Sequence, residues 1–440
     1  MFFLTRNRLL AATLATQFAY LSHSAHANDQ SGIIPGDVVD SEAVLESAGD
    51  LGSPSLDFQE GEDTILISPD ASSYQFYITD LESRMGPYAQ GLSEQLLGLG
   101  SVYQDQGLHT EAIDLFKRAV HIARINGGLY APEQIPLLQR EIRSLVAVGD
   151  FETADERQYY LYRVQARVYG AQSEQMSVAM LERAEWEREA YKLSVGETSF
   201  LRLLTMWELY SAVLRNIARE EGKLSLSLLR PLEGLLQTQY LISTWSPATA
   251  NGMQSGSVDE NYAEEARFSM VRVSNYKQGQ AVITAMREVY GYNGGESSPL
   301  PAETMVQLGD WHLWHQKRES ALAAYQEAWD EFGTLENGER LRQIHFGEPV
   351  LLPDIPGANQ DLSEPEVVRG YAELSFSITP RGRVSDLEVI STEPLETAGE
   401  EENEASPVQL LRRVKRLQFR PRFEDRSPVL VENVRRRYAY

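Results

Sequence analysis

Two histidines stand three residues apart in the segment WHLWH, residues 311–315. On a helix this spacing places both rings on one face, where they could ligate a metal such as zinc. The sequence suggests no nearby carboxylate or third ligand, so we interpret them as helix residues beside the packed side chains of Trp311 and Trp314. The motifs HExxH and GxSxG and the P-loop are absent. We therefore expect no enzyme activity, no cofactor and no metal.

The bulk composition excludes several other classes of function. The chain has 440 residues, enough for two or three domains, and contains no cysteine. Thiol catalysis, thiolate zinc sites and disulfides are thereby excluded. The formal net charge of −24 argues against nucleic acid as a general partner, because binding it requires a basic face.

Positive charge nevertheless gathers at the C-terminal end. Residues 407–440 hold ten Lys and Arg against three acids, a net of +7. One interpretation is a solvated face that is balanced by acidic segments such as residues 393–404. The other is attraction to an acidic partner: a receptor segment, phospholipid headgroups or the carboxylates of peptidoglycan.

The first 27 residues have the pattern of a cleavable signal peptide. Arg6 and Arg8 precede a short apolar stretch, and AHA at 25–27 offers small residues for cleavage. The alternative is an uncleaved anchor, but the apolar run is shorter than the roughly twenty residues that span a membrane. An exported chain without cysteine predicts the periplasm of a Gram-negative bacterium.

An acidic segment, residues 28–79, is expected to be disordered. Ten acids and no Lys or Arg lie between residues 28 and 63. Such a composition cannot bury enough apolar surface to offset the entropy of ordering.

Residues 80–345 predict an α-solenoid of tetratricopeptide (TPR) type. In such repeats, small residues let two antiparallel helices cross closely, and large residues fill the groove between helix pairs. The clearest copy is 96–120, a weaker one is 144–165, and a third is 305–332. The residues that carry the pattern are Leu99, Gly100, Tyr103, Ala112, Phe116 and Ala119 in the first copy, and Leu308, Gly309, Ala321, Tyr325 and Ala328 in the third.

The remaining connections are predicted from local composition. A helix over residues 225–243 should be bent or divided at Pro231. Residues 246–261 should form a loop. Residues 346–369 hold four prolines, which predicts a stiff, extended linker before a C-terminal domain at 370–440.

From Gly370 onward the hydrophobic period changes from 3.6 to 2. The segments 370–379 and 384–392 predict a hairpin that turns at PRGR. A helix over 407–419 and a last strand over 428–440 follow. The predicted fold is therefore mainly α, a TPR-like α-solenoid, with a small C-terminal α+β domain of ββαβ order.

This order, with GR in the turn and FRP after the helix, resembles the C-terminal domain of TonB-type energy transducers. Gly370, Gly382, Val384, Phe419 and Pro421 fall on the motif positions of that family. The resemblance implies that the last strand offers a sheet edge to a short segment of an outer-membrane receptor. TonB itself has an uncleaved membrane helix and a Pro-rich rod. Their replacement here by a signal peptide and a helical array favours an adaptor role.

We therefore expect a non-enzymatic, periplasmic protein-interaction component of transmembrane transport. It would dock TonB-dependent receptors or transport-complex components by the sheet edge, and another partner by the repeats. The alternative is an envelope scaffold or assembly factor that binds peptidoglycan or a protein complex without energy transduction. Membrane association is expected only through partners. The candidate partner-binding residues are Leu430, Glu432, Val434, Arg435, Arg436, Arg437, Tyr438, Arg412, Arg413 and Arg416.

Overall fold

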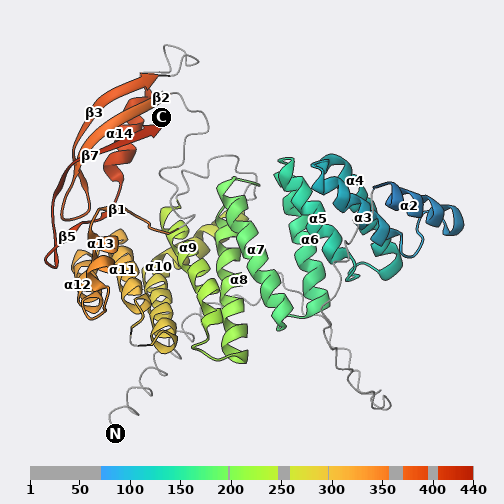
Figure 1. Cartoon of the computed structure of the whole chain (residues 1–440), viewed down its shortest axis with the longest axis horizontal. Helices are drawn as coiled ribbons and strands as arrows, with labels where there is room; N and C mark the ends of the chain where they lie inside the picture. The colour runs from blue at the N-terminus through green and yellow to red at the C-terminus, as the bar shows by residue number, and fades with distance from the viewer. Residues whose placement is uncertain are drawn as a thin grey trace, which may run out of the picture. The chain divides into compact units, whose positions relative to one another are not determined.

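The computed structural model of the chain describes residues 71–196, 199–245, 258–295, 297–355, 370–394 and 405–439. These residues form two compact units, which divide between Asp150 and Phe151. Most of the described chain is helical (Figure 1). The signal-like residues 1–27 and the acidic residues 28–70 lie outside the described part.

The first unit is a stack of helices in which each packs on the next. Its elements are α2 (Ala71–Met85), α3 (Leu92–Asp105), α4 (His109–Gly127) and α5 (Gln134–Ala147). Helix α2 corrects one expectation, because residues 71–79 are helical and not part of the acidic disordered segment. The reason is packing: Ile78 is buried, and the ring of Tyr74 lies against Gly98 of α3.

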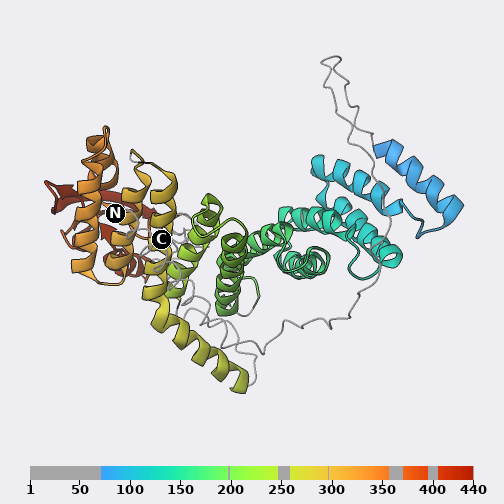
Figure 2. The same ribbon diagram turned by 90° about the horizontal axis from the view of Figure 1, so that it is seen from below.

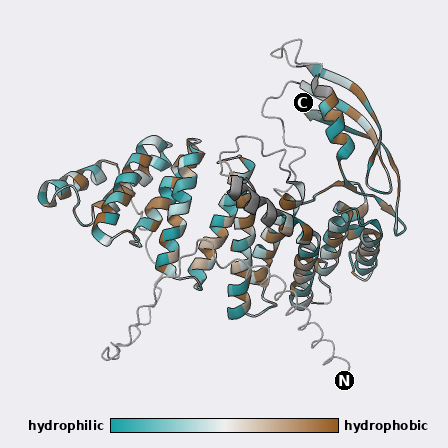
Figure 3. Cartoon of the chain, turned by 180° about the vertical axis from the view of Figure 1, so that it is seen from behind, coloured by the Kyte–Doolittle hydropathy of each residue, from teal (hydrophilic) through white to brown (hydrophobic). Residues whose placement is uncertain are grey.

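The second unit holds the remaining helices and all the described strands. Its helices are α6 (Phe151–Tyr169), α7 (Glu174–Lys192), α8 (Ser199–Glu220), the short 3₁₀ helix η1 (Leu226–Leu228), α9 (Leu229–Thr244), α10 (Val258–Asn293), α11 (Leu300–Trp314), α12 (Arg318–Phe332) and α13 (Gly338–Phe346). The N-terminal part of α10 projects beyond its neighbours (Figure 2). Hydrophobic and hydrophilic residues alternate along the helices (Figure 3), as amphipathic helices require.

Two helical hairpins show why the repeat pattern folds as it does. In the α3–α4 pair, a Cβ on Gly100 would lie 2.6 Å from the ring of Phe116, so only glycine permits this approach. In the α11–α12 pair, Gly309 meets the ring of Tyr325 in the same way. The signature alanines of both pairs are buried. The TPR-like helical array is thus present in the packing itself.

Other expectations for the array need correction. The predicted helix at 225–243 is divided just before Pro231, since η1 ends at Leu228 and α9 begins at Leu229. Pro231 itself does not bend α9, because it lies in the first turn, where its missing N–H has no helical partner to lose. The weaker repeat copy at 144–165 falls on both sides of the division between the units. Of the predicted loop at 246–261, residues 258–261 already belong to α10, and the rest lies outside the described residues.

The C-terminal domain has the predicted ββαβ order. Its long strands β2 (Gly370–Ile378), β3 (Val384–Pro394) and β7 (Val431–Ala439) form an antiparallel sheet in the order β3-β2-β7. Helix α14 (Ala405–Arg416) covers one face of it (Figure 1). Leu374 and Phe376 of β2 are buried there in one cluster with Leu410 and Val414 of α14. Short strands complete the domain: β4 (Phe419–Arg420), β5 (Phe423–Glu424) and β6 (Ser427–Pro428).

The expected linker is anchored at its start rather than free. Phe346, its first residue, is fully buried and packs against Tyr325 of α12 and Phe423 of β5. Strand β1 (Val350–Leu351) then pairs antiparallel with β4. Residues 346–355 therefore attach the C-terminal domain to the helices through the buried ring of Phe346 and the backbone pairing of β1 with β4. Residues 356–369 lie outside the described part.

A buried ion pair completes this junction. Arg420 of β4 donates from Nε and Nη2 to the two carboxylate oxygens of Asp310 in α11, at 2.9 and 2.7 Å. Both side chains are only 4% exposed. Tyr325 donates its hydroxyl to Asp310 at 2.8 Å, and Arg420 Nη1 donates to the carbonyl of His345 at 3.1 Å. Burial alone lowers the pKa of Arg420, but the Asp310 carboxylate outweighs it and holds that pKa above its ordinary value.

We predict that Arg420→Ala destabilises the second unit by about 3–5 kcal/mol, because it leaves the Asp310 carboxylate buried without its cation. Urea unfolding followed by tryptophan fluorescence measures this. The matched control is Arg426→Ala, which removes an exposed pair with Asp330 and should cost less than about 1 kcal/mol. Equal losses in the two variants would contradict the role of the buried pair.

Two glycines of neighbouring helices should respond to alanine with opposite signs. Gly309→Ala places a methyl group into the ring of Tyr325 and should destabilise by about 1–3 kcal/mol. Gly291→Ala, in the last turn of α10, meets nothing within 4 Å and should stabilise by about 0.5–1 kcal/mol. Thermal unfolding of both variants tests the close crossing of α11 and α12. The crossing is not as described if Gly309→Ala is neutral.

Candidate functional site

Strand β7 forms one edge of the C-terminal sheet. It pairs with β2 along one side, and no other described strand pairs with its outer side. Its outward backbone N–H and C=O groups therefore form a row that another extended chain could pair with. This edge is the candidate site.

A bulge limits the regular part of this edge. Between the paired positions Phe376↔Val434 and Ile378↔Val431, β7 contains one residue more than β2. Asn433 takes up the extra length with a φ of 59°, a left-handed conformation that asparagine tolerates. The regular edge is consequently Val434–Ala439. The predicted edge residues Leu430 and Glu432 lie before it, and Leu430 precedes β7 altogether.

The side chains of β7 alternate between the two faces of the sheet. Arg435 pairs with Ser375 and Arg437 with Glu373, and these positions alternate with the residues of β2 that are buried under α14. Arg435 and Arg437 therefore lie on the open face. Val434, Arg436 and Tyr438 lie on the face that α14 covers, where Val434 and Tyr438 are partly buried.

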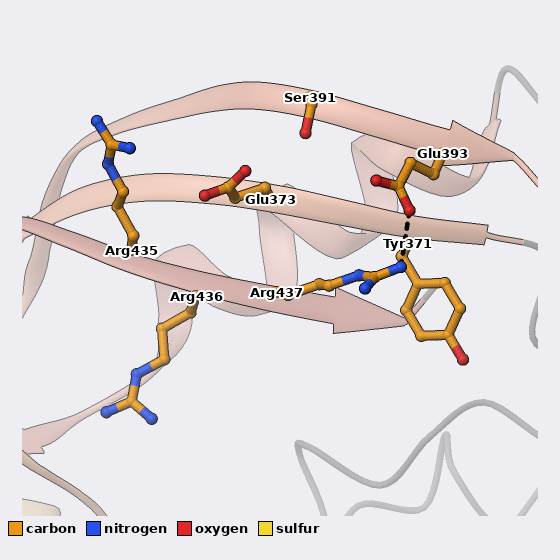
Figure 4. A pocket seen from close by; sticks show the side chains of 7 residues that line it. All are labelled: Tyr371, Glu373, Ser391, Glu393, Arg435, Arg436 and Arg437. Atoms are coloured by element: carbon orange, nitrogen blue, oxygen red, sulfur yellow. Dashed lines mark hydrogen bonds and ion pairs between the residues drawn. The ribbon is translucent and has the colours of Figure 1, made fainter.

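A shallow hollow of about 310 Å³ lies on the open face beside β7 (Figure 4). The Arg437 guanidinium crosses it, 4.4 Å above the ring of Tyr371, and forms an ion pair of 2.7 Å with Glu393 of β3. Both partners of this pair are more than half exposed, so it contributes little to stability. Among the described residues, Arg435 forms no ion pair and remains available to an acidic group.

The other wall of this hollow was not predicted from the sequence. The hollow is lined by Tyr371, Glu373 and Ser391 together with Glu393, Arg435, Arg436 and Arg437. Tyr371 and Glu373 are two residues apart in β2. This spacing is the one sequence signal that could have indicated that their side chains share the open face of the sheet. The predicted hairpin places Ser391 beside Glu373, whereas the position of β7 on the other side of β2 could not be read from the alternation.

The basic residues of α14 are not part of this site. Arg412 and Arg416 are exposed on the outer side of the helix, whose other side packs on the sheet. Arg413 is half-buried and has an interaction of its own. The predicted set of partner-binding residues thus divides between two surfaces, because α14 and the side chains of Arg435 and Arg437 lie on opposite faces of the sheet.

The motif residues of the predicted hairpin and helix meet at one point. Gly382 has a φ of 69°, and its Cα lies so close to the carbonyl of Phe419 that no side chain fits between them. The Phe419 N–H donates to the carbonyl of Gly382 at 2.8 Å. This hydrogen bond fixes β4 beside the turn. Since β4 also pairs with β1, the turn is linked to the junction between the C-terminal domain and the helices.

The histidine pair lies inside the helical array. The Nδ1 atom of His312 is 2.9 Å from the hydroxyl of Tyr276, and the ring of His315 packs on Trp311 at 4.3 Å between centroids. No three His, Cys, Asp or Glu side chains of the described residues are grouped as metal ligands. Burial lowers the pKa of His315 to about 4, and the charges of His312 and Lys317 act in the same direction.

Comparison with known proteins gives little beyond the fold. No protein-family model and no curated protein sequence matches the chain. Among solved structures, BtubC (BKLC) from P. vanneervenii is similar at 13% identity and a TM-score of 0.33, over 60% of this chain and 89% of its own. A kinesin light chain with nearly identical TPR-like repeats from Podosopora anserina is similar at 14% identity and a TM-score of 0.36, over 56% and 97%.

These superpositions are too loose to carry an argument, so the TPR-like character of the array rests on its own helix packing. None of the described helices has both the length and the apolar composition needed to cross a membrane.

The half-buried His315 should make stability depend on pH. Its folded pKa of about 4 lies below the ordinary value of 6.5, so the unfolded chain binds the extra proton between these values. Stability should fall as pH falls from about 6.5 to about 4, by about 1–2 kcal/mol from this group, because solvent screens a partly exposed ring. His315→Gln should flatten that part of the stability profile in urea titrations. His121→Gln, at an exposed histidine of α4, serves as the control, and an unchanged profile in His315→Gln would refute the assignment.

Proposed function

We propose that the chain is a non-enzymatic protein-interaction component that captures an extended segment of a partner along β7. The observation that carries this proposal is the outer side of Val434–Ala439, which no described strand covers. Pairing along an edge supplies main-chain hydrogen bonds, and side chains on the two faces supply selectivity. The helical array offers a second surface, and protein partners are the usual ligands of such arrays.

The partner class that fits best is the N-terminal segment of an outer-membrane receptor or of a transport component. Three features support it: the ββαβ order, the contact of Gly382 with Phe419, and the resemblance of these motif positions to TonB-type domains. The signal-like residues 1–27 support a periplasmic location. The role is that of an adaptor between two protein partners.

The C-terminal sheet of the proposed adaptor is attached directly to the helices that precede it. Arg420, Phe346 and the β1–β4 pair attach the sheet to α11–α13. A partner bound on β7 is therefore held by the same body that includes the C-terminal helices of the array. Binding at the edge and binding on α11–α13 would join two partners through this junction.

Neighbouring proline substitutions test the edge. Backbone N–H groups of successive residues in a strand point to opposite sides, so of Arg435→Pro and Arg436→Pro one removes a bond to β2 and the other an outward donor. We expect one variant to lose thermal stability. The other should keep its stability and lose partner binding, measured with the full chain on an array of synthetic N-terminal segments of outer-membrane receptors.

Arg435→Gln and Arg436→Gln control for the loss of charge at the same positions. The proposal fails if no segment binds the wild-type chain, or if the stable proline variant binds as well as its glutamine control. Sedimentation of the chain with purified sacculi, unchanged by both prolines, would instead favour the envelope-scaffold function.

A further inference from the structure

A second surface of the C-terminal domain is made by the outer side of α14. Leu410, Val414 and Leu417 bury the inner side of this segment against the sheet. The outward positions are Val408, Gln409, Arg412, Lys415 and Arg416, all exposed. Three cations therefore project from one helix face at spacings of three and four residues.

The hairpin turn adds two more cations to this surface. Arg383 donates from Nη1 to the carbonyl of Arg416 at 3.4 Å, and Gln418 donates from Nε2 to the carbonyl of Arg381 at 3.2 Å. The turn thus lies beside the C-terminal end of α14. We call the five residues Arg381, Arg383, Arg412, Lys415 and Arg416 the basic ridge.

Within the described part of the chain, no member of the basic ridge forms an ion pair. Nearby arginines do: Arg420 pairs with Asp310, Arg426 with Asp330 and Arg437 with Glu393. The whole chain has 64 acids against 40 Lys and Arg, so carboxylates are abundant. Like charges repel one another along the ridge, and an external polyanion would relieve that repulsion.

Burial and the charge of Arg318, at the start of α12, lower the pKa of Arg383. The first residue of α12 thus lies near enough to this end of the ridge to act on it as a further cation.

We propose that the basic ridge docks on an anionic phospholipid surface. Three of the cations lie within about 6 Å along the C-terminal end of α14, and the other two lie on the adjoining turn. Five cations divided between two exposed elements match the charge density of a lipid surface better than a single small anion. Val408, 49% exposed at the other end of the same face, can enter the interfacial region. Clusters of four to eight Lys and Arg on an amphipathic helix have the composition that binds anionic headgroups.

This inference goes beyond the proposed function and does not depend on it, and it replaces the expectation that the chain associates with a membrane only through partners. Arg435 and Arg437 of the edge lie on the face of the sheet that α14 does not cover, so partner and lipid occupy different surfaces. Acids elsewhere on the chain are screened beyond about 10 Å at moderate salt. The acids Glu400–Glu402 lie outside the described residues, and an assay on the full chain includes their effect.

The test is sedimentation of the full chain with vesicles of phosphatidylcholine, with and without phosphatidylglycerol. We expect binding only with phosphatidylglycerol, weakening as salt is raised. Arg412→Gln/Arg416→Gln should weaken partitioning about 30-fold, since each cation contributes about 1 kcal/mol near such a surface. Circular dichroism of each variant checks that the fold is kept.

Two matched variants distinguish the basic ridge from the open face and a charged lipid contact from a stereospecific one. Arg435→Gln/Arg437→Gln removes the same charge from the open face and should leave vesicle binding within about twofold. Arg412→Lys/Lys415→Arg/Arg416→Lys keeps the charge and should bind vesicles like the wild type. It tests the same positions independently if the glutamine variant does not fold. The proposal is overturned if the wild type binds vesicles equally well with and without phosphatidylglycerol. It is also overturned if Arg412→Gln/Arg416→Gln and Arg435→Gln/Arg437→Gln lose vesicle binding equally. A loss in the charge-keeping variant would indicate a stereospecific protein site instead.

Discussion

The buried pair of Arg420 and Asp310 is the constraint on which the arrangement of the C-terminal unit depends. Removing two charges from water costs several kcal/mol per ion. The attraction between the two ions offsets this cost only when their geometry is good and their remaining hydrogen bonds are made. Here Tyr325, the carbonyl of His345 and the carboxylate of Asp354 supply the remaining hydrogen bonds. The β1–β4 pair fixes the backbone beside them. The sheet cannot leave the helices without exposing Asp310 or burying it unpaired. A ββαβ domain that could be a mobile module is thereby made part of the array.

The same residues serve the repeat and the junction. Gly309 permits the close approach of Tyr325, which is what the TPR pattern requires of that position. The hydroxyl of Tyr325, which a phenylalanine would lack, then orients Asp310 for Arg420. The ring of Tyr325 also packs edge-on against Phe423 of β5. The open side of the last helical hairpin is therefore covered by α13 together with the strands β4 and β5.

Local patterns could predict the elements but not their partners. The spacing of Gly and Ala indicates the helical hairpins, and the alternation from Gly370 indicates the strands, because both signals lie within a few residues. Arg420 and Asp310 are 110 positions apart, and among ten C-terminal cations nothing in the sequence marks Arg420 as the buried one. Likewise, alternation could not show that Asn433 forms a bulge, or that α14 and Arg435 lie on opposite faces. The candidate site was therefore predicted as one surface where the structure has two.

The order of contacts through the domain determines how a load on the edge would travel. A partner pulling on β7 acts first on the hydrogen bonds to β2, which lies between β7 and β3. The hairpin of β2 and β3 passes the load to Gly382, whose carbonyl binds the N–H of Phe419 in β4. From β4 the load reaches α11 through the ion pair of Arg420 with Asp310. It also reaches residues 350–351 through the pairing of β4 with β1. Every step is a backbone pair or a buried ion pair, so the edge and the C-terminal helices respond as one body. A flexible tether would leave the sheet free to move, whereas this junction fixes the sheet against α11–α13.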